Sequence, residues 1–111
     1  MTESIIRSYL KQELGTDAVY TETPKHMPDE FVTFTLIDRE RVNHIDTVSY
    51  RFNSYAKSKG KAALLDEKVR AAMDDIIRMD AFSSSKLGGG DDLPDETLDR
   101  YRYRCYYNLV Y

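Results

Sequence analysis

The fold is decided by residues 31–79, which read FVTFTLIDRERVNHIDTVSYRFNSYAKSKGKAALLDEKVRAAMDDIIRM. Residues 31–38 and residues 47–55 each alternate aromatic or branched apolar side chains with polar ones. A period of two is that of a strand with one buried face. Because the polar residues between the two runs can extend both of them towards a turn near Asn43–His44, the sequence predicts an antiparallel hairpin.

The second half of this stretch changes to the period of a helix. After the lysine-rich segment 57–61, apolar side chains recur every fourth position at Leu65, Val69 and Met73 and continue to Ile76 or Ile77. This spacing predicts an amphipathic helix over about residues 62–79. Its apolar stripe needs a sheet to cover, and the hairpin with its flanking strands supplies one.

The flanking segments complete the predicted fold. An apolar period of four predicts an opening helix that ends near Gly15, and a short strand follows within residues 18–22. Beyond the main helix we expect a short strand over 82–87, a long flexible loop over about 88–99 and a terminal strand from Arg100. The predicted fold class is therefore a single α+β domain over residues 1–111. It has a mostly antiparallel sheet of four to five strands and two helices, in the order α-β-β-β-α-β-β.

Composition narrows the class of protein. The chain has 111 residues, of which 41% are hydrophobic and 32% charged, which suits one soluble globular domain. No apolar run approaches the roughly 18 residues of a membrane span, and the N-terminus lacks a signal-peptide pattern, so we expect neither membrane insertion nor export. The formal net charge of -3 gives no overall attraction for nucleic acid or anionic lipid.

Residues with reactive side chains form no recognisable catalytic pattern. His26 and His44 lie in separate predicted loops, and the single cysteine, Cys105, lies within a strand beside aromatic residues, as a small buried apolar residue does. The glycines at 88–90 run into acids and a proline rather than into the Lys-Ser/Thr of a phosphate-binding loop. The acids over 91–99 lack calcium-loop spacing and are interpreted as a solvated loop. We therefore predict no catalytic residue, no metal and no cofactor, and an enzyme is the third hypothesis.

The terminal run RYRYRCYY, residues 100–107, gives the main competing hypothesis. Interleaved arginines and tyrosines can hold phosphates and stack bases. In a strand, however, Arg100, Arg102 and Arg104 point away from the face of Tyr101 and Tyr103, so a packed core with a solvated basic edge is favoured. A small nucleic-acid-binding module stays open as an alternative.

Four segments together resemble the small tail-terminator and tail-completion (head–tail joining) proteins of long-tailed bacteriophages and prophages. They are the opening helix IIRSYLKQEL, the proline-bearing loop before FVTFTLID, the lysine-rich passage from TVSYRF into the main helix, and the tyrosine-rich end RYRYRCYYNLVY. The resemblance implies a non-enzymatic ring, commonly of six copies, at the head-proximal end of the tail tube. Its partners would be other copies of itself, the tail tube and the head connector, with DNA met only as it passes through the lumen. It would reside in the virion tail or neck, and in the host cytoplasm during assembly. Another neck or minor capsid role is the alternative within this class.

The charged segments are the expected contact surfaces of such an assembly, because basic and acidic stretches on one small domain favour complementary contacts between copies. The candidate interface residues are Lys57, Lys59, Lys61, Asp91, Asp92, Asp95, Glu96, Arg102 and Arg104.

Overall fold

A computed structural model describes residues 2–22, 24–26, 28–78, 82–95 and 100–110, without the side chains of residues 2, 42 and 91–95. The predicted fold class and element order are confirmed. The strands form one sheet in the order β1-β2-β3-β5-β4, in which β1 is parallel to β2 and the other neighbours are antiparallel. The elements are α1 (Thr2–Leu14), β1 (Val19–Tyr20), β2 (Glu30–Val42), β3 (Ile45–Ala56), α2 (Lys59–Asp74), a 3-10 turn (Ile76–Arg78), β4 (Ser84–Asp95) and β5 (Arg100–Val110).

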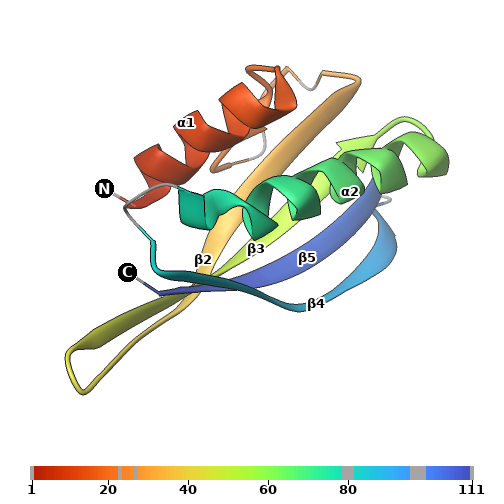
Figure 1. Ribbon diagram of the computed structural model, residues 1–111. Coiled ribbons are helices and arrows are strands. Elements are labelled where there is room, and N and C mark those ends of the chain that lie inside the picture. Colours follow the sequence, from red (N-terminus) through yellow and green to blue (C-terminus); the bar gives the residue numbers. More distant parts are fainter. Residues whose placement is uncertain (1, 23, 27, 79–81, 96–99, 111) are drawn as a thin grey trace.

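Both helices lie on one face of the sheet, and the core fills the space between these two layers (Figure 1). The predicted apolar stripe is confirmed, because Val69 and Met73 of α2 and Ile76 of the 3-10 turn are fully buried, while Ile77 is 51% exposed. The three buried side chains share one apolar cluster with α1 and with the aromatic side chains of the three central strands. The sheet contributes Phe34, Tyr50, Phe52 and Tyr107, all buried.

The other face of the sheet, called here the open face, carries no helix (Figure 1). A small apolar cluster covers the part of it next to β1. There the rings of Phe31 and Tyr55 stack with their centroids 4.6 Å apart, beside Ala18 and Tyr20. Next to this cluster, the open face carries polar and charged side chains of β2, β3 and β5.

The β2–β3 hairpin is confirmed, with its turn at Asn43 and His44. Both residues have positive φ, 52° and 66°, which is the backbone of the tight turn that joins twisted strands. Pairing of β3 with β5 starts only at Thr47, so the end of the hairpin extends beyond the sheet (Figure 1). We call residues 40–47 the arm.

The main helix begins earlier than predicted. Ser58 caps α2 and its Oγ accepts a hydrogen bond from the backbone N–H of Lys61 at 3.2 Å, so the helix starts at Lys59. It ends at Asp74, before the 3-10 turn. Lys59 and Lys61 therefore belong to the first helical turn rather than to a loop.

The prediction of a loop over 88–99 is wrong for residues 88–95, because β4 continues to Asp95 and pairs with β5 throughout. Two glycines of β4 occupy positions that a larger residue would fit poorly. Gly89 has φ +145° at a β-bulge, and a Cβ on Gly90 would overlap the guanidinium of Arg70 and lie 2.7 Å from the Arg104 carbonyl oxygen. Residues 96–99 lie outside the described residues.

Candidate functional site

The structure places the predicted lysines at the end of the sheet where β3 passes into α2. Lys57 Nζ lies 3.0 Å from Asp29 Oδ1, and both side chains are exposed. The hydrogen bond and charge of Lys57 lower the pKa of the Asp29 carboxyl. Ala56 is in register with Tyr101, and Tyr101 with Pro94, so the lysines are at the same end of the sheet as the acidic end of β4.

The predicted acids and arginines lie on adjacent strands of one sheet. Asp91 is directly opposite Arg104, Asp92 is opposite Tyr103, and Asp95 is opposite Arg100. Residues opposite each other in an antiparallel pair share a face. Arg104 lines the open face, and the sequence could not show the pairing of Asp91 with Arg104 because it placed the acids in a loop. Glu96 lies outside the described residues.

A hollow in the open face collects the basic residues. It measures about 310 Å³, and we call it the arginine hollow. Among the side chains that the structure describes, Arg51 from β3 joins Arg102 and Arg104 from β5 there, together with the carboxylate of Glu22. The other lining residues are Thr21, Thr33, Thr35, Asn53 and Tyr55.

Buried polar atoms line the same hollow. Asn53 Nδ2 donates to Thr33 Oγ1 at 3.2 Å. Arg51 Nε is buried and has no hydrogen-bond partner in the part of the chain that the structure describes. Sequence reasoning missed Arg51 as a site residue, because its place beside β5 follows from a strand pairing between distant segments.

The alternation predicted for the terminal strand holds in its second half. Cys105, Tyr107 and Leu109 are fully buried beneath the helices. Tyr101 is 43% exposed, so the prediction that it packs inward is wrong. It lies near the end of the strand, opposite Ala56, the last residue of β3.

A buried polar cluster joins α2 to β5. Asp66 is 4% exposed and its Oδ2 lies 2.8 Å from Arg70 Nε. The Tyr107 hydroxyl lies 2.9 Å from Asp74 Oδ1 and 3.0 Å from the Arg70 carbonyl oxygen. Burial raises the pKa of Asp66, and the opposing charge of Arg70 only partly offsets this effect. The cluster holds the helix on the sheet.

Cys105 adjoins this cluster and is expected to be chemically inert in the folded protein. Burial, together with the negative charge of Asp66, raises the pKa of its thiol to about 12. We predict no reaction with a thiol reagent at pH 8 under native conditions, and rapid reaction in denaturant. The measurement is the stoichiometry of modification by mass spectrometry. Full modification of the native protein would contradict the buried placement.

Asp66 should give the stability a specific pH dependence. Because its folded-state pKa is raised, the folded protein retains a proton that the unfolded chain releases, so the free energy of unfolding falls as pH rises through this window. Asp66→Asn removes this contribution. Urea unfolding from pH 4 to pH 7 should show the wild type losing stability relative to Asp66→Asn as pH rises. A difference that stays constant or grows in favour of the wild type would contradict the raised pKa.

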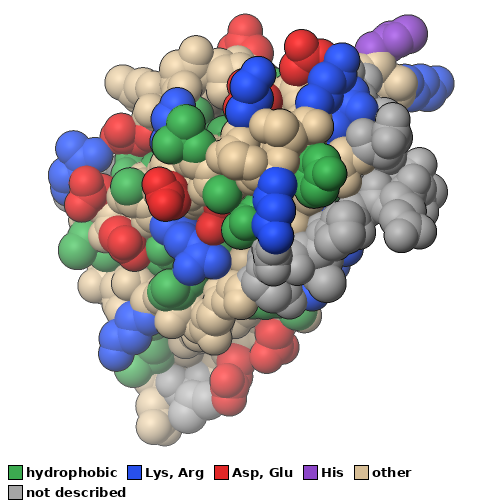
Figure 2. All heavy atoms as spheres, turned by 90° about the vertical axis from the view of Figure 1, so that its right-hand side faces the viewer, with side chains coloured by type: hydrophobic (Ala, Val, Ile, Leu, Met, Phe, Trp, Pro, Cys, Tyr) green, Lys and Arg blue, Asp and Glu red, His purple; other side chains and the backbone are tan. Residues whose placement is uncertain are grey.

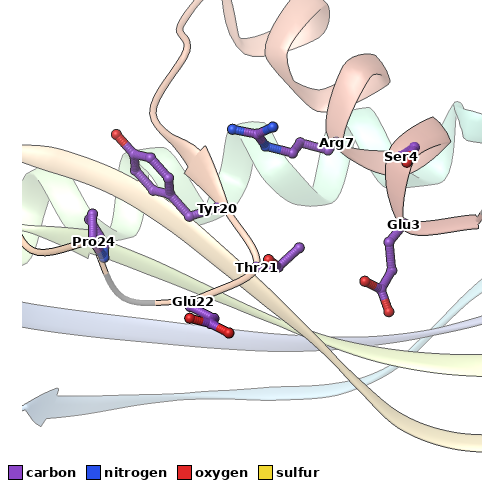
Figure 3. A pocket seen from close by; sticks show the side chains of 7 residues that line it. All are labelled: Glu3, Ser4, Arg7, Tyr20, Thr21, Glu22 and Pro24. Atoms are coloured by element: carbon purple, nitrogen blue, oxygen red, sulfur yellow. The ribbon is translucent and has the colours of Figure 1, made fainter.

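A second cleft, of about 490 Å³, lies between the start of α1 and the chain after β1 (Figure 3). Arg7 Nε donates to the Val19 carbonyl oxygen at 2.8 Å, and so its side chain ties α1 to β1. The lining is mixed in charge. It consists of Glu3, Ser4, Arg7, Tyr20, Thr21, Glu22 and Pro24.

Charges of both signs are interspersed over the face seen in Figure 2 rather than gathered by sign. Among the described residues, no three or more His, Cys, Asp or Glu side chains are grouped as a metal site. In the same part of the chain, neither helix has the length and apolar character needed to cross a membrane.

These features define a class: a small α+β domain with one five-stranded sheet, two helices on one face, a polar open face and a projecting hairpin.

No known protein family and no curated protein matches the sequence. The fold is similar to that of a chain in a solved structure described as "Virion of native gene transfer agent (GTA) particle". The TM-score is 0.69 at 12% sequence identity, over 97% of this chain and 92% of the other. This likeness is one of fold.

Proposed function

We propose that the protein is a non-enzymatic structural component of a bacteriophage or prophage virion. More specifically, we propose a tail-terminator or tail-completion protein that forms a ring, commonly of six copies, at the head-proximal end of the tail. The observation that carries the proposal is the fold likeness to a virion chain over nearly the full length of both chains. The resemblance of four sequence segments to tail-terminator proteins supports the finer role.

The shape of the domain suits such an assembly. The arm extends past the sheet, and Ile45 within it is 54% exposed. A two-stranded hairpin gains little stability by itself in water, so a contact with another subunit would stabilise the arm. The long edge strand β4 offers a second surface, since an edge presents unpaired backbone groups. Different surfaces at different ends of one domain favour head-to-tail contacts, which form a ring where the rotation between neighbouring copies closes.

The charged residues predicted from sequence are proposed contacts of this ring or of its partners, the tail tube and the head connector. The lysines lie at the end of the sheet opposite to the arm, and the arginines lie on the open face between them. These residues are Lys57, Lys59, Lys61, Asp91, Asp92, Asp95, Glu96, Arg102 and Arg104.

Deleting the gene from a phage or prophage that carries it tests the terminator role. If the ring stops polymerisation of the tube, electron microscopy of the lysate should show tails of excess length and heads without tails. Supplying the wild-type chain in trans should restore the normal length. Tails of unchanged length joined to heads would contradict the terminator role, and normal particles lacking the protein altogether would contradict a virion role.

A small nucleic-acid-binding module is the second candidate, favoured by the three arginines of the arginine hollow. It predicts DNA or RNA binding that weakens steeply as salt rises. Absence of salt-sensitive binding at low ionic strength would remove this candidate.

A further inference from the structure

The outer edge of β2 is open over most of its length. β1 pairs with β2 at Val32 and Thr33 alone, and no other strand that the structure describes lies along this edge. The backbone N–H of Val32 donates to the Ala18 carbonyl oxygen at 2.9 Å, so the backbone groups of Val32 point away from β3. Because this direction alternates along a strand, every second residue beyond Val32 also points its backbone groups outward. We call the outer side of residues 34–42 the free edge.

The sequence along this edge is of a kind that readily pairs with another strand. Residues 31–37 read FVTFTLI and contain no charge, no glycine and no proline. Seven-residue segments of this composition pair with copies of themselves where their backbone is accessible. Ile37, the last residue of the segment, is 48% exposed. Uncontrolled strand addition here would join molecules into open-ended aggregates.

A β-bulge ends this segment and turns a different residue outward. Leu36 and Asp38 are opposite consecutive residues of β3, so Ile37 between them has no partner there. The extra residue shifts the alternation by one position. Asp38 therefore directs its backbone towards β3, and Arg39 is the first residue beyond the bulge whose N–H points to the free edge.

The carboxylate of Asp38 occupies this outward N–H. Asp38 Oδ1 accepts a hydrogen bond from the backbone N–H of Arg39 at 2.8 Å, and the Asp38 side chain is exposed. Asp38 forms no ion pair with any residue that the structure describes. An incoming strand would have to displace the carboxylate from this N–H and place its own carbonyl oxygens beside a negative charge. Both effects oppose strand pairing at this position.

We infer that Asp38 is a guard residue that blocks the addition of a strand to the free edge of β2. It directly follows the uncharged segment 31–37, which is where charged residues that suppress aggregation are placed. The bulge contributes by interrupting the regular row of backbone groups. The inference goes beyond the proposed function and does not depend on it, since it concerns a contact that the protein avoids.

Asp38→Ala tests the guard. Losing one charge-assisted hydrogen bond at the edge should strengthen pairing there by about tenfold or more, measured by sedimentation across a concentration series. Glu40→Ala is the matched control. It removes the same charge from an exposed position two residues further along β2, on the same side of the sheet, and should associate as the wild type does. Asp38→Asn keeps an oxygen acceptor without the charge and should be intermediate.

Amide hydrogen exchange, followed by NMR, shows where the molecules meet. In dilute solution the Arg39 amide should exchange faster in Asp38→Ala than in the wild type, because its acceptor is lost. As the concentration rises, the outward amides of Phe34, Leu36 and Arg39 should become protected in Asp38→Ala and stay unchanged in the wild type. The urea midpoint of dilute Asp38→Ala should equal that of the wild type, because the altered side chain is exposed.

Three results would overturn the inference. The first is association of Asp38→Ala no stronger than that of Glu40→Ala. The second is association that leaves the amides of the free edge unprotected, because the molecules would then meet elsewhere or through unfolded chains. The third is a wild type that already shows this protection at high concentration. None of these results decides whether a ring forms, so failure of the guard and failure of the proposed function are distinguishable.

Discussion

Replacing Val69 by Asp is expected to abolish cooperative folding. Val69 is fully buried in the middle of α2, within the apolar cluster that joins both helices to the sheet. The substitution loses about 1.5–3 kcal/mol of apolar burial and adds the cost of placing a polar group or charge in the core, about 2–7 kcal/mol for a polar group alone. A domain of this size is stable by only about 5–15 kcal/mol.

Leu64→Asp is the matched control for this prediction. It makes the same kind of change on the same helix, at a side chain that is 52% exposed. Circular dichroism during heating should show a sharp transition for Leu64→Asp and none for Val69→Asp. Equal thermal stability of the two variants would mean that the buried face of α2 is assigned wrongly.

Gly90→Ala is expected to destabilise the protein by about 1–3 kcal/mol. An added Cβ would lie 2.7 Å from the carbonyl oxygen of Arg104, which is backbone in the neighbouring strand and cannot turn aside. It would also displace the guanidinium of Arg70, which forms the ion pair with Asp66. Strand pairing and the buried cluster would therefore be disturbed together.

Gly60→Ala provides the comparison, because a Cβ at Gly60 meets nothing within 4 Å. That residue lies in the first turn of α2, where alanine should be neutral or stabilising by up to about 1 kcal/mol. Chemical denaturation of both variants measures the difference. If Gly90→Ala were as stable as Gly60→Ala, the close approach of Arg70 and β5 to this glycine would be disproved.

Much of the fold follows from local periodicity. The period of two over 31–38 and 47–55 and the period of four after residue 61 each reflect a face that must be buried, so the hairpin and main helix are predictable. The strand at 84–95 is not, because its glycines are explained by the distant side chain of Arg70 and by pairing with β5. A glycine-rich acidic stretch has the same local pattern whether it is a loop or such a strand.

The candidate contact surfaces likewise combine residues that the sequence reveals with residues that only the strand pairing reveals. Arg102 and Arg104 are visible in the sequence because they alternate with tyrosines. Arg51 stands alone in its segment, and it becomes their neighbour only through the pairing of β3 with β5. Likewise, the charges of the arm can be assigned to faces only once the register of the hairpin, including its bulge between Leu36 and Asp38, is known.

The absolute mass of the protein in solution shows whether this domain assembles into a ring, as we propose. Light scattering across a concentration series, with negative-stain images of the same sample, gives both the mass and the shape. We expect a closed ring of about six copies, in solution or on addition of tail tubes. A strict monomer at every concentration, with tubes present as well as absent, would contradict it.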